Sequence, residues 1–172
     1  KEIHKIKILD IKKSPIPDVD FIPGNIDEIS SINKATKNSD IVIHLAAALG
    51  VINTEKHPIH TLDTNIYGTR NVLESCKKNN VRKIILSSSS EVYGEPKKVP
   101  ISENDDVIPI TNYGISKLAA EEYIKAYSKT FGLHFTIFRL FNVGGISAFN
   151  WSDAGNKNFS SLYFLKRRSW GA

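Results

Sequence analysis

The chain has 172 residues and a mass of 19.2 kDa, enough for one domain with a sizeable hydrophobic core and too little for two. Hydrophobic residues make up 41% and charged residues 24%, which excludes a disordered chain, a collagen-like fibre and a disulfide scaffold. Three of the five net positive charges come from the run at 166–168, so we expect no nucleic-acid binding. No apolar run is long enough for a membrane span or a secretory signal.

Short β-type runs alternate along the chain with longer amphipathic runs. The predicted elements, in chain order, are strands 5–11 and 19–22, helix 28–37, strand 41–47, helix 61–79, strand 83–88, helix 112–130 and strand 134–140. Strands that alternate with helices of this length imply right-handed crossovers and a parallel sheet. We therefore expect an α/β fold of the doubly wound, Rossmann-like class.

Residues 1–145 are predicted to form this domain, whereas residues 146–172 show no clear period and are left unassigned, as a disordered tail or the start of a truncated domain. The single cysteine, Cys76, has no partner for an internal disulfide, which favours a cytoplasmic protein. The chain contains no methionine, even at position 1, and we therefore expect it to be a fragment.

Tyr113 and Lys117 stand four residues apart in YGISK and so share one face of the predicted helix. A lysine ammonium beside a phenol stabilises the phenolate and lowers the pKa of the tyrosine from about 10 toward neutrality. Tyr113 is therefore a candidate general base. The spacing alone is common in helices and has little specificity.

A serine cluster, Ser87 to Ser90, follows the buried run KIIL. In open parallel sheets, ligands bind at the carboxyl ends of the strands, where a serine can hydrogen-bond a substrate hydroxyl. A serine-rich turn that stabilises loop backbone is the alternative interpretation. The order of IVIHLAA, the serine cluster and YGISK is more specific than any of these alone.

Five blocks, IVIHLAA, TNIYGTRNVLE, KIILSSSSEVYG, NYGISKLAAEEY and FRLFNV, resemble the NAD-dependent epimerase/dehydratase family of nucleotide-sugar enzymes, the extended short-chain dehydrogenase/reductases. The resemblance covers about residues 5–145 and follows the order of the family. It implies an NAD cofactor, a nucleotide-sugar substrate (we expect a UDP-sugar) and a parent protein that can form a homodimer.

The resemblance also implies roles for individual residues. Tyr113 would take the proton of the sugar 4-hydroxyl, Lys117 would hold the cofactor ribose and lower the pKa of Tyr113, and Ser89 would assist. Asn142 would contact the substrate diphosphate. The residues expected at the cofactor are Asp10, Asn25, Ile26, Leu45, Ala46, Ala47, Asn65, Ser87, Tyr113 and Lys117, with Asp10 on the adenosine ribose and Asn65 ordering the loop beside the site.

Glu91 separates the possible reactions. By resemblance, a glutamate two residues after the catalytic serine is typical of sugar 4,6-dehydratases and UDP-glucuronate decarboxylases, in which it would move a C5 proton. Ser90 stands where the dehydratase pattern has an aspartate, which weakens the case for dehydration and leaves epimerisation or decarboxylation open. A purely structural Glu91 is the other interpretation.

The chain departs from the family at both ends. The first strand and its GxxGxxG turn have no counterpart, and the strand should lie near the middle of the sheet, so we expect exposed strand edges there. An inactive remnant and a non-catalytic NAD-binding regulator therefore remain alternatives. We expect no metal site: His57 and His60 lack a third ligand and Pro58 argues against a regular helix, while His44 is expected in the core.

Overall fold

The computed structural model describes residues 5–141 and 162–166, and for residues 51–53 and 162–166 it describes the backbone only. The strands are β1 (Lys5–Asp10), β2 (Asp20–Pro23), β3 (Ile41–His44), β4 (Lys83–Ser89), β5 (His134–Leu140) and β6 (Leu162–Lys166). The helices are α1 (Ile29–Thr36), α2 (Val51–Lys56), α3 (Pro58–Lys78) and α4 (Asn112–Phe131), with a short 3₁₀ turn, η1 (Ser90–Tyr93).

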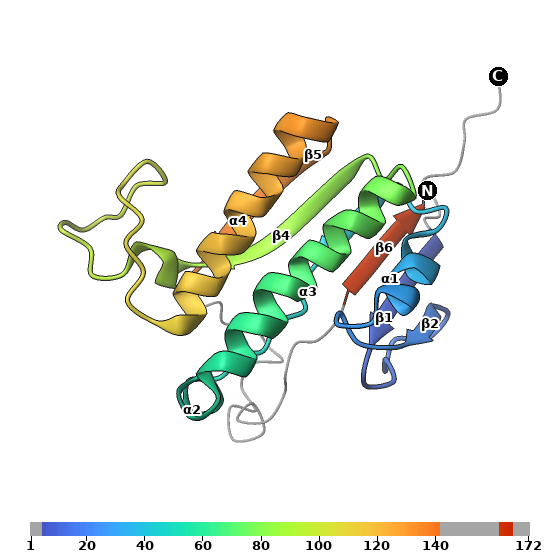
Figure 1. Ribbon diagram of the computed structural model, residues 1–172, viewed down its shortest axis with the longest axis horizontal. Coiled ribbons are helices and arrows are strands. Elements are labelled where there is room, and N and C mark those ends of the chain that lie inside the picture. Colours follow the sequence, from blue (N-terminus) through green and yellow to red (C-terminus); the bar gives the residue numbers. More distant parts are fainter. Residues whose placement is uncertain (1–4, 142–161, 167–172) are drawn as a thin grey trace.

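The six strands form one sheet in the order β2-β1-β6-β3-β4-β5 (Figure 1). The pairs β1–β2, β3–β4 and β4–β5 are parallel, which confirms the predicted Rossmann-like α/β class. β6 is antiparallel to both of its neighbours. It comes from the tail that the sequence analysis left unassigned, and it pairs with the edges of β1 and β3 that we expected to be exposed.

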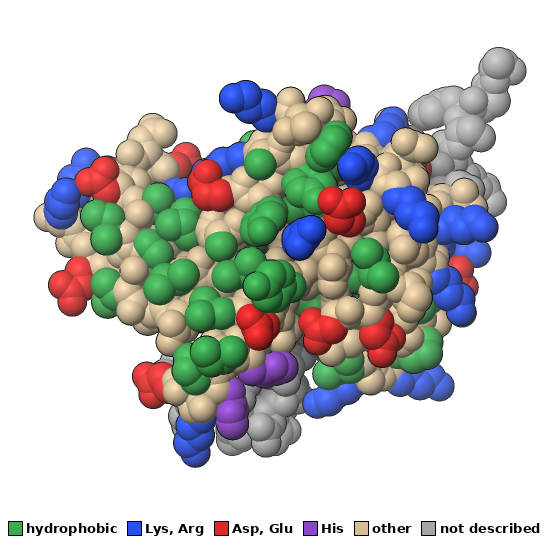
Figure 2. All heavy atoms as spheres, viewed as in Figure 1, with side chains coloured by type: hydrophobic (Ala, Val, Ile, Leu, Met, Phe, Trp, Pro, Cys, Tyr) green, Lys and Arg blue, Asp and Glu red, His purple; other side chains and the backbone are tan. Residues whose placement is uncertain are grey.

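Helices α1, α3 and α4 pack side by side in one layer over the sheet (Figure 1). Alternate strand residues face this layer and form the core, and among them Leu9, Val42 and Ile84 are fully buried. On the outer surface of the layer, acidic and basic side chains are interspersed (Figure 2). No helix in the described part of the chain has the length and apolarity needed to cross a membrane.

Helix α3 begins three residues earlier than predicted, at Pro58. Proline at the first helical position loses no hydrogen bond, because that N–H has no partner within a helix. The sequence-based argument that Pro58 opposes a helix is therefore wrong. Helix α2, which precedes α3, was not predicted at all.

Candidate active site

The carboxyl ends of β1, β3 and β4 lie at one edge of the sheet, as parallel strands require. β1 ends at Asp10, β3 is followed by Leu45–Ala47, and β4 ends at Ser89. The sheet therefore brings together three segments that the sequence marked as binding or catalytic. They approach from positions that are far apart in the chain.

Helix α4 begins beside this edge because Thr111 caps it. Its hydroxyl accepts a hydrogen bond from Gly114 N at 2.9 Å, which satisfies one of the free donors of the first turn. A Cβ on Gly114 would lie 2.6 Å from the carbonyl oxygen of Glu91, so only glycine allows the helix to approach η1 this closely. Cap and glycine together place Tyr113 and Lys117 in the first two turns, against the end of β4.

Lys117 is buried, with 4% of its surface exposed, and its Nζ donates a hydrogen bond to the carbonyl oxygen of Ser87 at 2.8 Å. Burial lowers the pKa of Lys117 to about 8, because the charged form loses its hydration. The ammonium lies 5.5 Å from the centre of the Tyr113 ring. The predicted pairing of the two residues on one helix face is thus present at the carboxyl end of β4.

The electrostatics of Tyr113 run opposite to the sequence-based expectation. Burial raises the pKa of Tyr113 to about 12, and the negative charge of Glu91 adds to the rise. In the protein alone, the pKa of Tyr113 is therefore raised although the Lys117 ammonium lies beside its ring. A phenolate at neutral pH therefore requires a further change at the site, such as the arrival of a positive charge.

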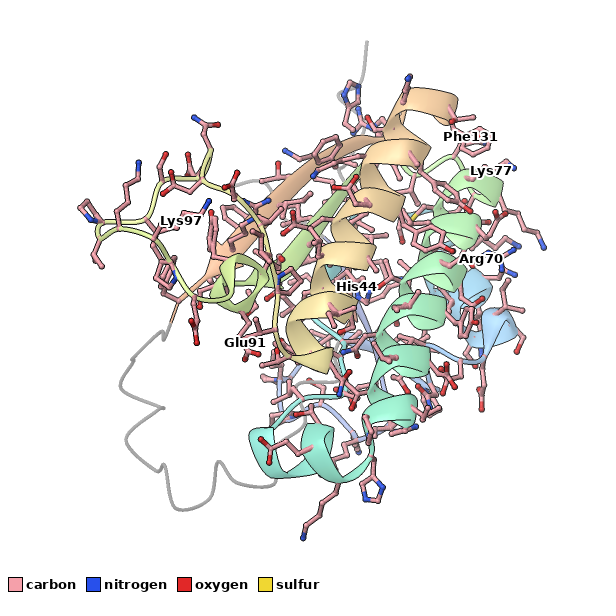
Figure 3. The ribbon with its side chains drawn as sticks, turned by 60° about the vertical axis from the view of Figure 1, so that its left-hand side comes forward. His44, Arg70, Lys77, Glu91, Lys97 and Phe131 are labelled. Atoms are coloured by element: carbon pink, nitrogen blue, oxygen red, sulfur yellow. The ribbon has the colours of Figure 1, made fainter. Side chains whose placement is uncertain are left out.

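Glu91 is exposed, yet its carboxylate is hydrogen-bonded at the start of α4. The Thr111 hydroxyl donates to Glu91 Oε2 at 2.6 Å, and Figure 3 shows Glu91 beside the first turn of the helix. The Glu91 backbone N–H donates to Ser89 Oγ at 3.2 Å. Glu91 therefore connects Ser89 to the cap of the helix that carries Tyr113. These contacts support a structural role for Glu91.

Asn65, on α3, holds the segment that follows β3. It is 2% exposed, accepts a hydrogen bond from Ala48 N at 2.7 Å and donates to Ala48 O at 3.1 Å and Ser116 Oγ at 2.9 Å. Ser116 in turn donates to the carbonyl oxygen of Tyr113 at 2.7 Å. One amide thus orders the loop after β3 and connects it to the catalytic candidate on α4.

The residues expected at the adenosine end of the cofactor separate into two groups. Asp10 is 7% exposed at the end of β1, and its Oδ1 accepts from Lys12 N at 2.8 Å. Asn25 donates to Asp27 at 3.1 Å nearby. Ile26, however, is 3% exposed and lies in the core against Gly68 of α3, so its side chain packs rather than lines an open site.

Sequence reasoning missed a buried charge next to the site. Glu121, on α4, is fully buried and accepts hydrogen bonds from Ser88 Oγ at 2.6 Å and from Arg139 on β5. Burial alone would raise the pKa of Glu121, but these hydrogen bonds outweigh it and hold the pKa below its ordinary value. The available signal was that Lys117, Glu121 and Ile124 share one helix face, which places the two charges beside the apolar stripe. This signal does not identify Arg139 as the partner of Glu121.

His44 is in the core, as expected, behind α3 and α4 (Figure 3). Its Nε2 lies 2.9 Å from Thr69 Oγ1, and burial, followed by the charge of Lys117, lowers its pKa to about 3. Asn142 lies outside the described residues. Within the described ranges, no three His, Cys, Asp or Glu side chains are placed to hold a metal ion.

Comparisons with known proteins agree on one family for this chain. The model of the NAD dependent epimerase/dehydratase family matches residues 2–161. The UDP-glucose 4-epimerase of Halalkalibacterium halodurans is 36% identical over 132 residues, which cover 76% of this chain and 40% of that protein. The UDP-N-acetyl-alpha-D-glucosaminuronate decarboxylase of Bacillus cytotoxicus is 36% identical over 143 residues, which cover 80% and 44%.

Solved structures agree with the sequence relatives. UDP-glucose 4-epimerase from Thermotoga maritima, crystallised with UDP-glucose, matches with a TM-score of 0.74 and 30% identity, covering 81% of this chain and 48% of that one. UDP-glucose 4-epimerase from Brucella ovis in complex with NAD matches with a TM-score of 0.71 and 31% identity, covering 78% and 42%. The chain thus spans less than half the length of these proteins.

Proposed function

Because this chain belongs to the NAD-dependent epimerase/dehydratase family, we propose that it carries the catalytic half of a nucleotide-sugar enzyme of the UDP-glucose 4-epimerase type. One observation carries the proposal: Lys117, buried at the carboxyl end of β4, lies beside the ring of Tyr113. This is the place where a parallel sheet binds its ligands, and the pairing puts a cation next to a candidate base.

The described residues fit the two ribose ends of an NAD molecule. Asp10 closes β1 and can accept from the hydroxyls of the adenosine ribose, and the Lys117 ammonium can donate to those of the nicotinamide ribose. Leu45, Ala46 and Ala47 lie between them after β3. None of the described strands is followed by a glycine-rich turn for the pyrophosphate. When bound, NAD supplies the hydride acceptor at sugar C4.

The side chains of the protein carry out the proton transfer from the sugar 4-hydroxyl. Tyr113 takes the proton of the sugar 4-hydroxyl. Because the pKa of Tyr113 is raised, nearby positive charge must first stabilise its phenolate. Ser89 Oγ accepts from the Glu91 N–H, so its own hydroxyl hydrogen can be donated to a substrate oxygen. The Lys117 ammonium, with its pKa of about 8, is mostly protonated at neutral pH and stabilises the phenolate as it forms.

Epimerisation is favoured over reactions in which Glu91 acts at C5. The Glu91 carboxylate is engaged by Thr111, and a proton acceptor at C5 would have to give up this hydrogen bond. A UDP-sugar decarboxylase is the second candidate, supported by the 36% identity to a decarboxylase and by the presence of Glu91. Replacing Glu91 by Gln separates the two, because it preserves the bond from Thr111 and removes the base.

The test is Tyr113→Phe, with Tyr123→Phe on the same helix as the matched control. With NAD present, we expect interconversion of UDP-glucose and UDP-galactose to fall by about 10²–10⁴-fold in Tyr113→Phe and to stay near wild type in the control. NAD binding, measured by calorimetry, should be retained in both. Turnover near wild type in Tyr113→Phe would disprove the assignment.

The alternatives of a non-catalytic regulator and an inactive remnant have their own outcome in the same experiment. A wild-type chain that binds NAD without turning over any UDP-sugar would support the regulator. A chain that neither binds NAD nor turns over substrate would support the remnant. Either result would place the epimerase chemistry outside this chain.

A further inference from the structure

Strand β6 holds the two parts of the sheet together. It pairs with Lys5–Leu9 of β1 on one side and with Ile41–His44 of β3 on the other. Among the described strands, β1 and β3 do not pair with each other. The backbone connection between the pair β2–β1 and the trio β3–β4–β5 therefore runs through β6.

β6 differs from the rest of the sheet in direction and in origin. The described pairings that do not involve β6 are all parallel, and β6 is antiparallel to both neighbours. The match to the family model ends at residue 161, one residue before β6 begins. A segment outside the family pattern thus occupies a central position of the sheet, visible in Figure 1 as the red strand between β1 and the strands behind α3 and α4.

We propose that the space between β1 and β3, here called the central slot, is a strand-binding site, and that residues 162–166 are its ligand, bound within the same chain. The backbone N–H and C=O groups along both walls of the slot need partners. They flank the fully buried Leu9 and Val42, where unpaired groups would be costly. One extended peptide satisfies both walls at once.

The class of ligand follows from the walls. Backbone pairing requires an extended segment without proline, and the apolar neighbours favour β-branched, aliphatic or aromatic residues. The segment Leu-Tyr-Phe-Leu-Lys meets both requirements. Because backbone pairing does not depend on side-chain identity, another segment of this chemistry can enter the slot when residues 162–166 leave it.

A cysteine cross-link tests the register directly. Ile43 and Tyr163 are opposite each other in the ladder, so Ile43→Cys with Tyr163→Cys should form an intramolecular disulfide on mild oxidation. Ile43→Cys with Phe164→Cys is the matched control, because a shift of one residue places the two side chains on opposite faces. The native thiol should not interfere, because burial raises the pKa of Cys76 to about 12.

Binding of a separate peptide tests whether the slot accepts a ligand. Proline at position 164 removes a donor from a strand that is paired on both sides, so Phe164→Pro should vacate the slot. A fluorescent peptide with the sequence of residues 160–168 should then bind the full-length variant. It should bind wild type far more weakly, because the tethered strand has an effective concentration on the order of millimolar.

The results divide clearly. A monomeric disulfide in the Tyr163 pair, with none in the control pair, supports the slot and its ligand. Equal cross-linking of both pairs, a Tyr163 pair that stays reduced, or only disulfide-linked dimers would overturn the proposal. So would a folded Phe164→Pro variant that binds no peptide, and if that variant does not fold, the cross-link decides. These readouts use neither NAD nor sugar and so are independent of the proposed function.

Discussion

Arg139→Met is the most informative single change, because it isolates the buried charge of Glu121. In the structure, Arg139 Nε lies 3.0 Å from Glu121 Oε1 and its Nη2 lies 2.8 Å from Oε2. Its Nη1 also donates to Tyr93 OH at 3.0 Å and to Glu103 O at 3.1 Å. The substitution leaves the fully buried Glu121 with the Ser88 hydroxyl and with Lys125, whose Nζ is 3.9 Å away.

The expected cost is large. Removing one partner of a buried ion pair destabilises a protein by about 3–5 kcal/mol. We expect a cost toward the lower end, because Lys125 remains near the Glu121 carboxylate. For a domain of this size, the loss corresponds to a fall in Tm of about 6–20 °C. The control is Arg82→Met, which breaks the pair between the exposed Arg82 and the half-buried Asp40 and should change the free energy of unfolding by less than about 1 kcal/mol.

The pH dependence distinguishes a buried charge from lost packing. In wild type the pKa of Glu121 is below its ordinary value, so its contribution to stability is present above the ordinary carboxyl pKa and is lost as the pH falls through the native pKa. In Arg139→Met, burial is no longer outweighed and the pKa should rise above the ordinary value. The carboxylate then destabilises the variant at neutral pH, and protonation relieves this on acidification.

Urea unfolding of wild type and Arg139→Met between pH 7 and pH 5 measures the effect. The difference in the free energy of unfolding between the two proteins should shrink as the pH is lowered. A difference that stays constant or grows would show that the cost comes from packing and not from the uncompensated charge.

Two further predictions concern the candidate site. Asn65→Leu should destabilise the protein by about 2–5 kcal/mol in urea unfolding, because Ala48 N and O would be buried without partners. The control, Asn71→Leu, removes one half-buried hydrogen bond to Ile26 O and should cost less. Equal costs would argue against the role of Asn65 in ordering the loop. Glu91→Gln should lower the pKa of Tyr113 from about 12, because a negative charge beside the phenol is lost, but not to its ordinary value, because burial is the larger cause. NMR titration of ¹³Cζ-tyrosine measures this shift, with Glu95→Gln as the control, and an unchanged or higher pKa of Tyr113 would contradict the assignment of Glu91 as its neighbouring charge.

The sequence by itself determined the parallel strands, the two long helices and the pairing of Tyr113 with Lys117. Local pattern decides these features: continuous apolar runs form the buried strands, and a spacing of four residues places two side chains on one helix face. The predicted start of this helix at residue 112 also agrees with the structure, in which α4 begins at Asn112. The expectation of exposed strand edges near the middle of the sheet followed from the family resemblance rather than from the residues.

Only the tertiary structure decided the rest, because it depends on contacts between residues far apart in the chain. The aperiodic tail contains β6, whose place is set by the unpaired edges of β1 and β3 and not by its own sequence. Glu121 resembles a solvated helix charge until Arg139, 18 residues away, is seen beside it. Spacing predicted a lowered pKa for Tyr113, but burial and the carboxylate of Glu91, contributed by another segment, raise it. Burial and long-range charge cannot be obtained from spacing alone, and here they determine the chemistry of the site.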